Sequence, residues 1–192
     1  MTDQITPNLV DFELIVQHHG PVNLHVVNLA LARFQSAAVR ANQSTAERLA
    51  TLQALNAIPL LGETTFLALA QLEITRNASR LLWLESVEPG SSVFRGKVAN
   101  IANGVFWFYL GAVGSGVLDR QDWHREFVDA VDHAGKEFVW NVVDSLNHSL
   151  PRPNNPDGTD IKAEIVGDRV RIVVHPRKQE TQISYSPMPP LR

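Results

Sequence analysis

The chain of 192 residues has no cysteine. That absence excludes disulfide bonds, zinc sites built from thiolates and cysteine nucleophiles. The first residues, MTDQITPN, lack both the positive charge and the apolar stretch of a secretory signal. Together these absences predict a cytoplasmic protein.

A strong charge of one sign is missing as well. Lysine and arginine total 17 and the acidic residues total 20, so the net charge is only -3. The chain therefore has no strongly basic field for DNA or RNA, and we expect no nucleic-acid partner. With 44% hydrophobic and 19% charged residues, the composition is that of an ordinary globular protein.

Recognisable catalytic motifs are missing too. The nucleophile turn G-x-S-x-G does not occur in the sequence. His18, His19 and His25 cluster near the end of a predicted strand, where His19 is a candidate general base. Histidines in such places more often simply end a strand. No motif points to a cofactor, so we expect none.

The most prominent feature present is one uncharged run, residues 98–118, which reads VANIANGVFWFYLGAVGSGVL. Its length matches the ~20 residues that cross a membrane, but Asn100 and Asn103 would be costly in lipid. Its glycines 111, 114 and 116 resemble a phosphate-binding loop, although a helical pattern follows instead of a βαβ unit. We prefer a third interpretation, in which the run is a buried helix at the centre of the core.

Hydrophobic periodicity predicts the other elements, since recurrence at three and four residues indicates a helix and alternation indicates a strand. A capping box of Ser44 and Glu47 marks one helix start. The dipeptide Gly167-Asp168 marks a hairpin turn. The predicted helices are 22–41, 44–58 and 122–147, and the predicted strands are 10–18, 66–76, 81–88, 92–98, 161–166 and 169–174.

These elements predict an α+β fold in one globular domain, residues 1–176. An antiparallel meander over residues 66–98 and the C-terminal hairpin pack with two helical hairpins. The first hairpin is made by the two helices before residue 59. The second joins the buried hydrophobic helix 98–118 to the long helix 122–147. A parallel α/β fold is not expected, because the strands do not alternate with helices.

The last residues, 177–192, are polar and rich in proline, which predicts a disordered tail. The tail ends in PMPPLR, with Pro187 and Pro190 at P-x-x-P spacing and Arg192 two residues later. This spacing is typical of a polyproline II peptide that docks in an aromatic groove. It is also frequent by chance in proline-containing tails.

One polar face of the long helix is a candidate metal site. Glu126, Asp129 and His133 follow each other at three and four residues, so they share a face with ligand-competent spacing. The same face lies opposite the apolar stripe, where solvated charges are expected anyway. We therefore expect a solvated surface, with these three residues as the only metal candidates.

The two predicted helices 98–118 and 122–147 are rich in aromatic residues, and these residues predict an interaction surface. Large apolar patches on a monomer generally mark a contact with a protein or a membrane. The sequence thus favours a non-catalytic interaction or regulatory protein, such as an adaptor, an immunity protein or a regulatory subunit, that binds itself or a protein partner. The alternatives are membrane insertion of residues 98–118 and a small metal- or histidine-dependent enzyme. The candidate interaction residues are Trp107, Trp123, Phe127, Phe138 and Trp140.

Overall fold

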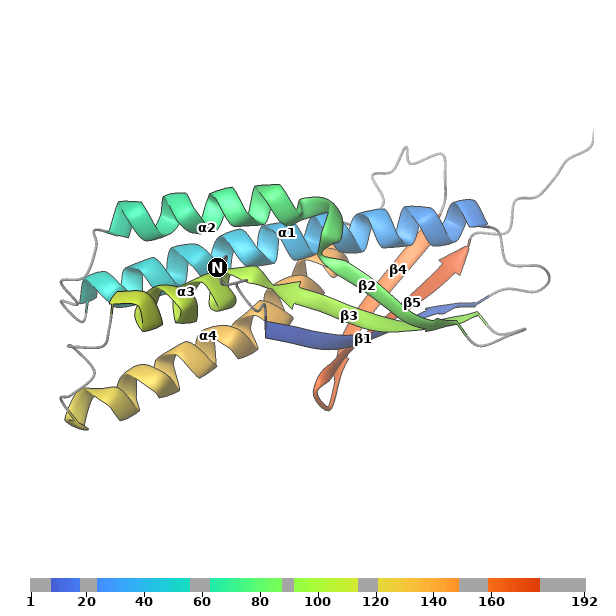
Figure 1. Cartoon of the computed structure of the whole chain (residues 1–192). Coiled ribbons are helices and arrows are strands. Elements are labelled where there is room, and N and C mark those ends of the chain that lie inside the picture. The colour runs from blue at the N-terminus through green and yellow to red at the C-terminus, as the bar shows by residue number, and fades with distance from the viewer. Residues whose placement is uncertain are drawn as a thin grey trace, which may run out of the picture.

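The computed structural model describes residues 8–17, 24–55, 63–87, 92–113, 121–148 and 159–176. This part of the chain has an α+β fold, with four α-helices and one five-stranded mixed sheet (Figure 1). The helices are α1 (Leu24–Leu55), α2 (Glu63–Asn77), α3 (Ile101–Val113) and α4 (Gln121–His148), with a 3-10 turn η1 (Ala78–Arg80). The strands are β1 (Asn8–Val16), β2 (Leu82–Val87), β3 (Val93–Asn100), β4 (Thr159–Val166) and β5 (Arg169–Pro176).

The sheet is centred on β1, in the order β2-β3-β1-β5-β4. Strand β1 pairs antiparallel with β3 and parallel with β5. The parallel pair was not expected from the antiparallel runs in the sequence. It forms because β5 returns beside the first strand only after all four helices, a non-local pairing that no short-range pattern can reveal. Figure 1 shows α1 running the length of the molecule, over the sheet at one end and among the other helices at the other.

The two faces of β1 follow the alternation in its sequence. Phe12, Leu14 and Val16 are buried, and Phe12 meets Phe34 of α1 edge to face at 4.8 Å between ring centroids. The side chain of Glu13 lies on the opposite face. There it accepts hydrogen bonds from Arg95 of β3 and Arg171 of β5. Each donor Nε lies 3.2 Å from a carboxylate oxygen.

Helix α1 is a single helix from Leu24 to Leu55, so the predicted hairpin between residues 22–41 and 44–58 is wrong. Residues 37–50 contain no glycine or proline, and nothing in the backbone chemistry stops the helix. Ser44 therefore lies inside the helix and not at its start. Thr45 Oγ1 donates a hydrogen bond back to Ala41 O at 2.8 Å, as hydroxyls inside helices do. The helical hairpin exists, but its second arm is α2.

Helix α2 replaces the first strand of the predicted meander, which was assigned to residues 66–76. The alternation that suggested a strand covers only the second half of that segment. The longer pattern is helical, because Phe66, Ala70 and Ile74 recur every four residues and all three are buried. The meander is therefore reduced to the antiparallel hairpin β2–β3, which was predicted correctly.

Residues 98–113 of the uncharged run are divided between two elements, and residues 114–118 lie outside the described part of the chain. The first three residues of the run end β3, and α3 begins directly at Ile101. Residues 98–106 are all buried, and the exposed positions begin at Trp107 and Phe108. Insertion of the whole run into a membrane would thus require the core to come apart. Among the described residues, no helix has both the length and the apolar character to span a bilayer.

Helix α4 occupies Gln121–His148, in agreement with the predicted helix 122–147. Its buried stripe contains Val131, Ala134, Phe138 and Val142. This stripe packs mainly against α1, whereas the sequence suggested α3 as the partner. The C-terminal hairpin β4–β5 is confirmed, and Gly167 takes the positive φ of 66° that its tight turn needs.

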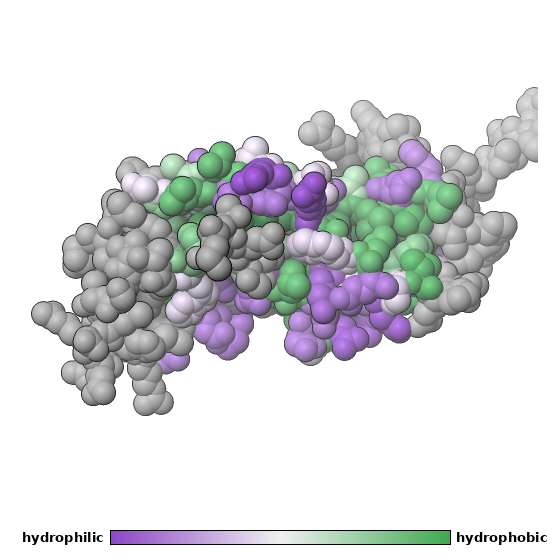
Figure 2. All heavy atoms as spheres, viewed as in Figure 1, coloured by the Kyte–Doolittle hydropathy of each residue, from purple (hydrophilic) through white to green (hydrophobic). Residues whose placement is uncertain are grey.

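The surface is not uniform in polarity. Figure 2 shows apolar side chains gathered over β2, β3 and the first half of α1. Exposed apolar residues in these elements include Leu24, Leu84 and Val87. Strand β2 is also an edge of the sheet, and a register shift between Leu84 and Ser86 interrupts its pairing with β3. Such a bulge is a usual way to protect an edge strand against further pairing.

Candidate functional site

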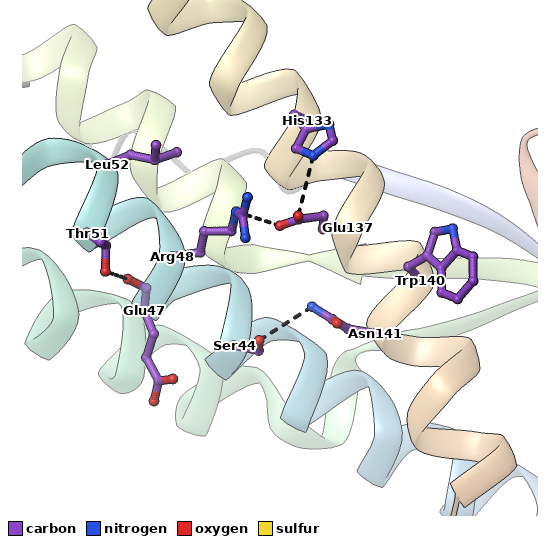
Figure 3. Close-up of a pocket in the computed structure, with 9 residues that line it drawn as sticks. All are labelled: Ser44, Glu47, Arg48, Thr51, Leu52, His133, Glu137, Trp140 and Asn141. Carbon is purple, nitrogen blue, oxygen red and sulfur yellow. Dashed lines mark hydrogen bonds and ion pairs between the residues drawn. The ribbon is translucent and has the colours of Figure 1, made fainter. Parts of the chain in front are cut away.

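A groove of about 870 Å³ lies between α1 and α4 (Figure 3). It is open to solvent along its length and mixes polar with apolar side chains. Residues at four-residue spacing supply both walls, as expected where two long helices lie side by side. The lining residues are Ser44, Glu47, Arg48, Thr51, Leu52, His133, Glu137, Trp140 and Asn141.

Two side-chain contacts cross this groove. Asn141 Nδ2 donates to Ser44 Oγ at 3.4 Å, and Arg48 Nε lies 2.6 Å from Glu137 Oε2. The residue numbers rise on α1 as they fall on α4, so the two helices are antiparallel. This arrangement explains why Ser44 and Glu47 looked like a helix start. Both residues are polar because they line a groove, and neither caps a helix.

Glu137 is the centre of the charged part of the groove. Its second oxygen, Oε1, lies 3.4 Å from His133 Nε2, and Figure 3 shows Arg48 and His133 directed at the same carboxylate. The side chain of Glu137 is 28% exposed, so the Arg48 pair is partly shielded from water. Only the Arg48–Glu137 pair joins the two helices, because His133 belongs to the same helix as Glu137. Within the lining residues, no serine or threonine hydroxyl contacts His133 or a carboxylate that could activate it.

Trp140 stands on the rim of the groove and is 65% exposed. It lies on the side of α4 opposite the buried Phe138 and Val142, so helix geometry directs it outward. Trp140 also borders a second hollow on its other side. One exposed indole therefore separates two concave surfaces.

The second hollow, of about 490 Å³, lies between α4, α3 and the β4–β5 turn. Its rim carries an ion pair in which Lys136 Nζ is 2.8 Å from Asp132 Oδ2. The hydrogen bond with Asp132 is the main cause that raises the pKa of Lys136. Its lining is more apolar than that of the groove. The residues are Asn8, Asn103, Asp132, Gly135, Lys136, Val139, Trp140, Ile165, Gly167 and Asp168.

Asn103 is the buried polar residue of this hollow, with only 5% of its surface exposed. Its backbone N–H donates to Asn100 Oδ1 at 3.1 Å, so Asn100 caps the start of α3. Its side-chain Oδ1 has no hydrogen-bond partner among the described residues. The Nδ2 end faces α4, because a Cβ added to Gly135 would lie 3.5 Å from it.

A third asparagine secures the same helix start from a distance. Asn42 of α1 is fully buried, and its Oδ1 accepts a hydrogen bond from Ala102 N at 3.1 Å. Its Nδ2 donates to Ala99 O at 3.0 Å and to Ala38 O at 2.9 Å. The direct passage from β3 into α3 is therefore held by side chains from two elements.

No family model, curated protein or solved structure matches the chain. The arrangement of the side chains therefore carries any functional argument.

The predicted metal face is only partly described. Asp129 and His133 are exposed, and His133 is directed at Glu137. The side chain of Glu126 lies outside the described residues. Within the described part of the chain, no three histidine or acidic side chains gather closely enough to hold an ion.

The predicted interaction residues are distributed unevenly. Trp107 and Trp140 are exposed, at 44% and 65%, while Phe138 is fully buried in the core and offers no surface. The side chains of Trp123 and Phe127 lie outside the described residues, as does the motif of Pro187, Pro190 and Arg192. The sequence missed Asn103 and the pair Arg48–Glu137, because each depends on a contact between distant segments.

Proposed function

We propose that the protein is a non-catalytic interaction protein that binds through the outer face of α1 and α4 around Trp140, and that a second copy of the chain is the partner. The cytoplasmic location expected from the sequence belongs to the same proposal. The observation that carries it is the exposure of Trp140, at 65%, beside an open groove.

The aromatic residues support this proposal by their division between core and surface. Five phenylalanines are core residues and each is at most 2% exposed, while Phe108 is an exception at 43%. All three tryptophans with described side chains are at least 43% exposed. Tryptophan is enriched at the centres of protein interfaces, where its large ring is removed from water. The core residues are Phe12, Phe34, Phe66, Phe106 and Phe138, and the exposed tryptophans are Trp83, Trp107 and Trp140.

A second copy suits this face on electrostatic grounds. The groove contains acidic Glu47 and Glu137 together with basic Arg48, so charges of both signs are mixed on one surface. Such a face does not repel its own copy, as a surface of one sign would. Two antiparallel helices from each copy could pack through a two-fold axis as a four-helix contact.

Replacing Trp140 with serine is expected to raise the dimer dissociation constant by about 30-fold, because a central interface tryptophan contributes about 2 kcal/mol or more. The measurement is size-exclusion chromatography with light scattering over a dilution series up to about 100 µM, which detects micromolar association. The wild-type chain should appear as a dimer and Trp140→Ser as a monomer.

Trp83→Ser is the matched control, because Trp83 is an exposed tryptophan on β2, at 43%. The control should keep the wild-type dimer. A wild-type chain that remains monomeric throughout the series, or two variants that weaken the dimer equally, would contradict the proposal. Thermal unfolding of each variant excludes a general loss of folding.

A further inference from the structure

We propose that the hollow between α3, α4 and the β4–β5 turn binds a small, neutral, planar molecule with a carboxamide-type edge. The Asn103 side chain would recognise that edge, and the ring would lie against Trp140. This site is separate from the α1–α4 groove, although the two share the Trp140 indole. The volume of about 490 Å³ is within the range of small-molecule sites.

The unsatisfied amide of Asn103 points to a ligand in this hollow. Buried side-chain oxygens almost always have a hydrogen-bond partner, and exceptions in native proteins call for an explanation. Asn103 lines the hollow and only 5% of its surface is exposed. Its side-chain Oδ1 has no hydrogen-bond partner among the described residues. The Oδ1 atom is itself shielded from solvent, so a ligand that presents an N–H donor would reach it once the amide has turned this oxygen toward the hollow. Rotation of the amide about its terminal bond brings either polar end toward the hollow.

The glycine that faces this amide points to the same site. Gly135 lies inside α4, where glycine is a poor helix former. Steric need does not explain it, because an added Cβ would meet only Asn103 Nδ2, at an ordinary contact distance of 3.5 Å. A methyl group there would, however, cover the amide from the side of α4. The glycine therefore keeps the Asn103 amide accessible at the expense of helix stability.

The charges around the hollow define the ligand class. Lys136 is paired with Asp132 at 2.8 Å, and Asp168 adds a further negative charge at the rim. An anionic ligand would be repelled by the two carboxylates. With its oxygen turned toward the hollow, the Asn103 amide would accept one hydrogen bond from the N–H of a neutral carboxamide or lactam. Val139, Trp140 and Ile165 supply an apolar wall for a ring.

Two probes of equal shape test this class. Benzamide carries a donor and an acceptor, whereas benzoate has only acceptors and a negative charge. In a titration followed by 15N NMR, benzamide should bind in the millimolar range and shift the Trp140 indole signal and the Asn103 side-chain amide. Benzoate should shift neither. If benzamide leaves both signals unchanged, or if benzoate binds as well, the proposal is overturned.

Gly135→Ala is the decisive variant. It should raise Tm by about 2–4 °C, because alanine favours the helix. The same change should weaken benzamide binding by about tenfold, since roughly one hydrogen bond is blocked. A more stable protein that binds less cannot be explained by unfolding. Unchanged benzamide affinity in Gly135→Ala would overturn the proposal. The dimer test is independent, because this variant leaves Trp140 in place.

Discussion

Gly96→Ala should lower the free energy of unfolding by about 3 kcal/mol and Tm by about 6 to 12 °C. A Cβ on Gly96 would overlap the carbonyl oxygen of Trp83 in the neighbouring strand and would also press on the Phe12 ring at 3.0 Å. The obstacle is backbone, which cannot rotate away as a flexible side chain can. Strand β2 must move away from β3, and its pairing at the bulge weakens.

The measurement is urea or thermal unfolding of the full chain. Gly135→Ala provides a matched control, since the same chemical change there meets only an ordinary contact of 3.5 Å. The two glycine-to-alanine variants should move stability in opposite directions. Equal stability of Gly96→Ala and wild type would mean that β2 and β3 are not packed as closely as the structure shows.

Asn42→Ala is expected to remove about 3 kcal/mol of stability, for a different reason. The buried amide of Asn42 accepts a hydrogen bond from Ala102 N, which lies in the first turn of α3 and so has no carbonyl of that helix as a partner. The same amide donates a hydrogen bond to Ala99 O at the end of β3. Truncation leaves these backbone groups without that partner in the interior and opens a small cavity. We therefore expect the stability of the protein to be sensitive to substitutions at the junction between β3 and α3, as it is at Gly96.

Asn42→Leu separates the two contributions, because leucine restores the volume but not the hydrogen bonds. It should remain destabilised by about 2 kcal/mol or more, according to the usual penalty for unpaired buried groups. Asn141→Ala is the control, since its hydrogen bond to Ser44 is 3.4 Å long and exposed. That variant should change unfolding by less than about 0.5 kcal/mol. A near-wild-type Asn42→Leu would show that packing alone holds the junction.

Elements with a complete local signal were predictable. The apolar stripe of the long helix recurs from Trp123 to Leu146 in the sequence, and Gly167-Asp168 specifies a two-residue turn, so the long helix and the β4–β5 hairpin agree with expectation. The alternation of β1 was equally clear, since Phe12 and Leu14 enter the core while Glu13 does not. In each case the burial of one face produces a periodic spacing of apolar residues, which can be read from the sequence.

The wrongly predicted break in α1 also has a physical cause. The polar residues at 42–45 suggested a break in α1, but Asn42 is polar because it bonds to the start of α3. Ser44 is polar because it contacts Asn141 across the groove. Both contacts join segments far apart in the sequence. Local patterning has no means to distinguish a polar residue that ends a helix from one that binds another element.

By itself, the sequence determined the α+β class, the long fourth helix, the C-terminal hairpin and the absence of thiol chemistry. These features follow from periodicity, turn residues and composition, all of which are local quantities. Only the tertiary structure decided that β5 lies parallel to β1 and that α4 packs on α1. It also placed Trp140 between two hollows and Asn103 beside Gly135. Those arrangements depend on which apolar surfaces from distant segments pack against each other and exclude water. That packing is a property of the whole fold.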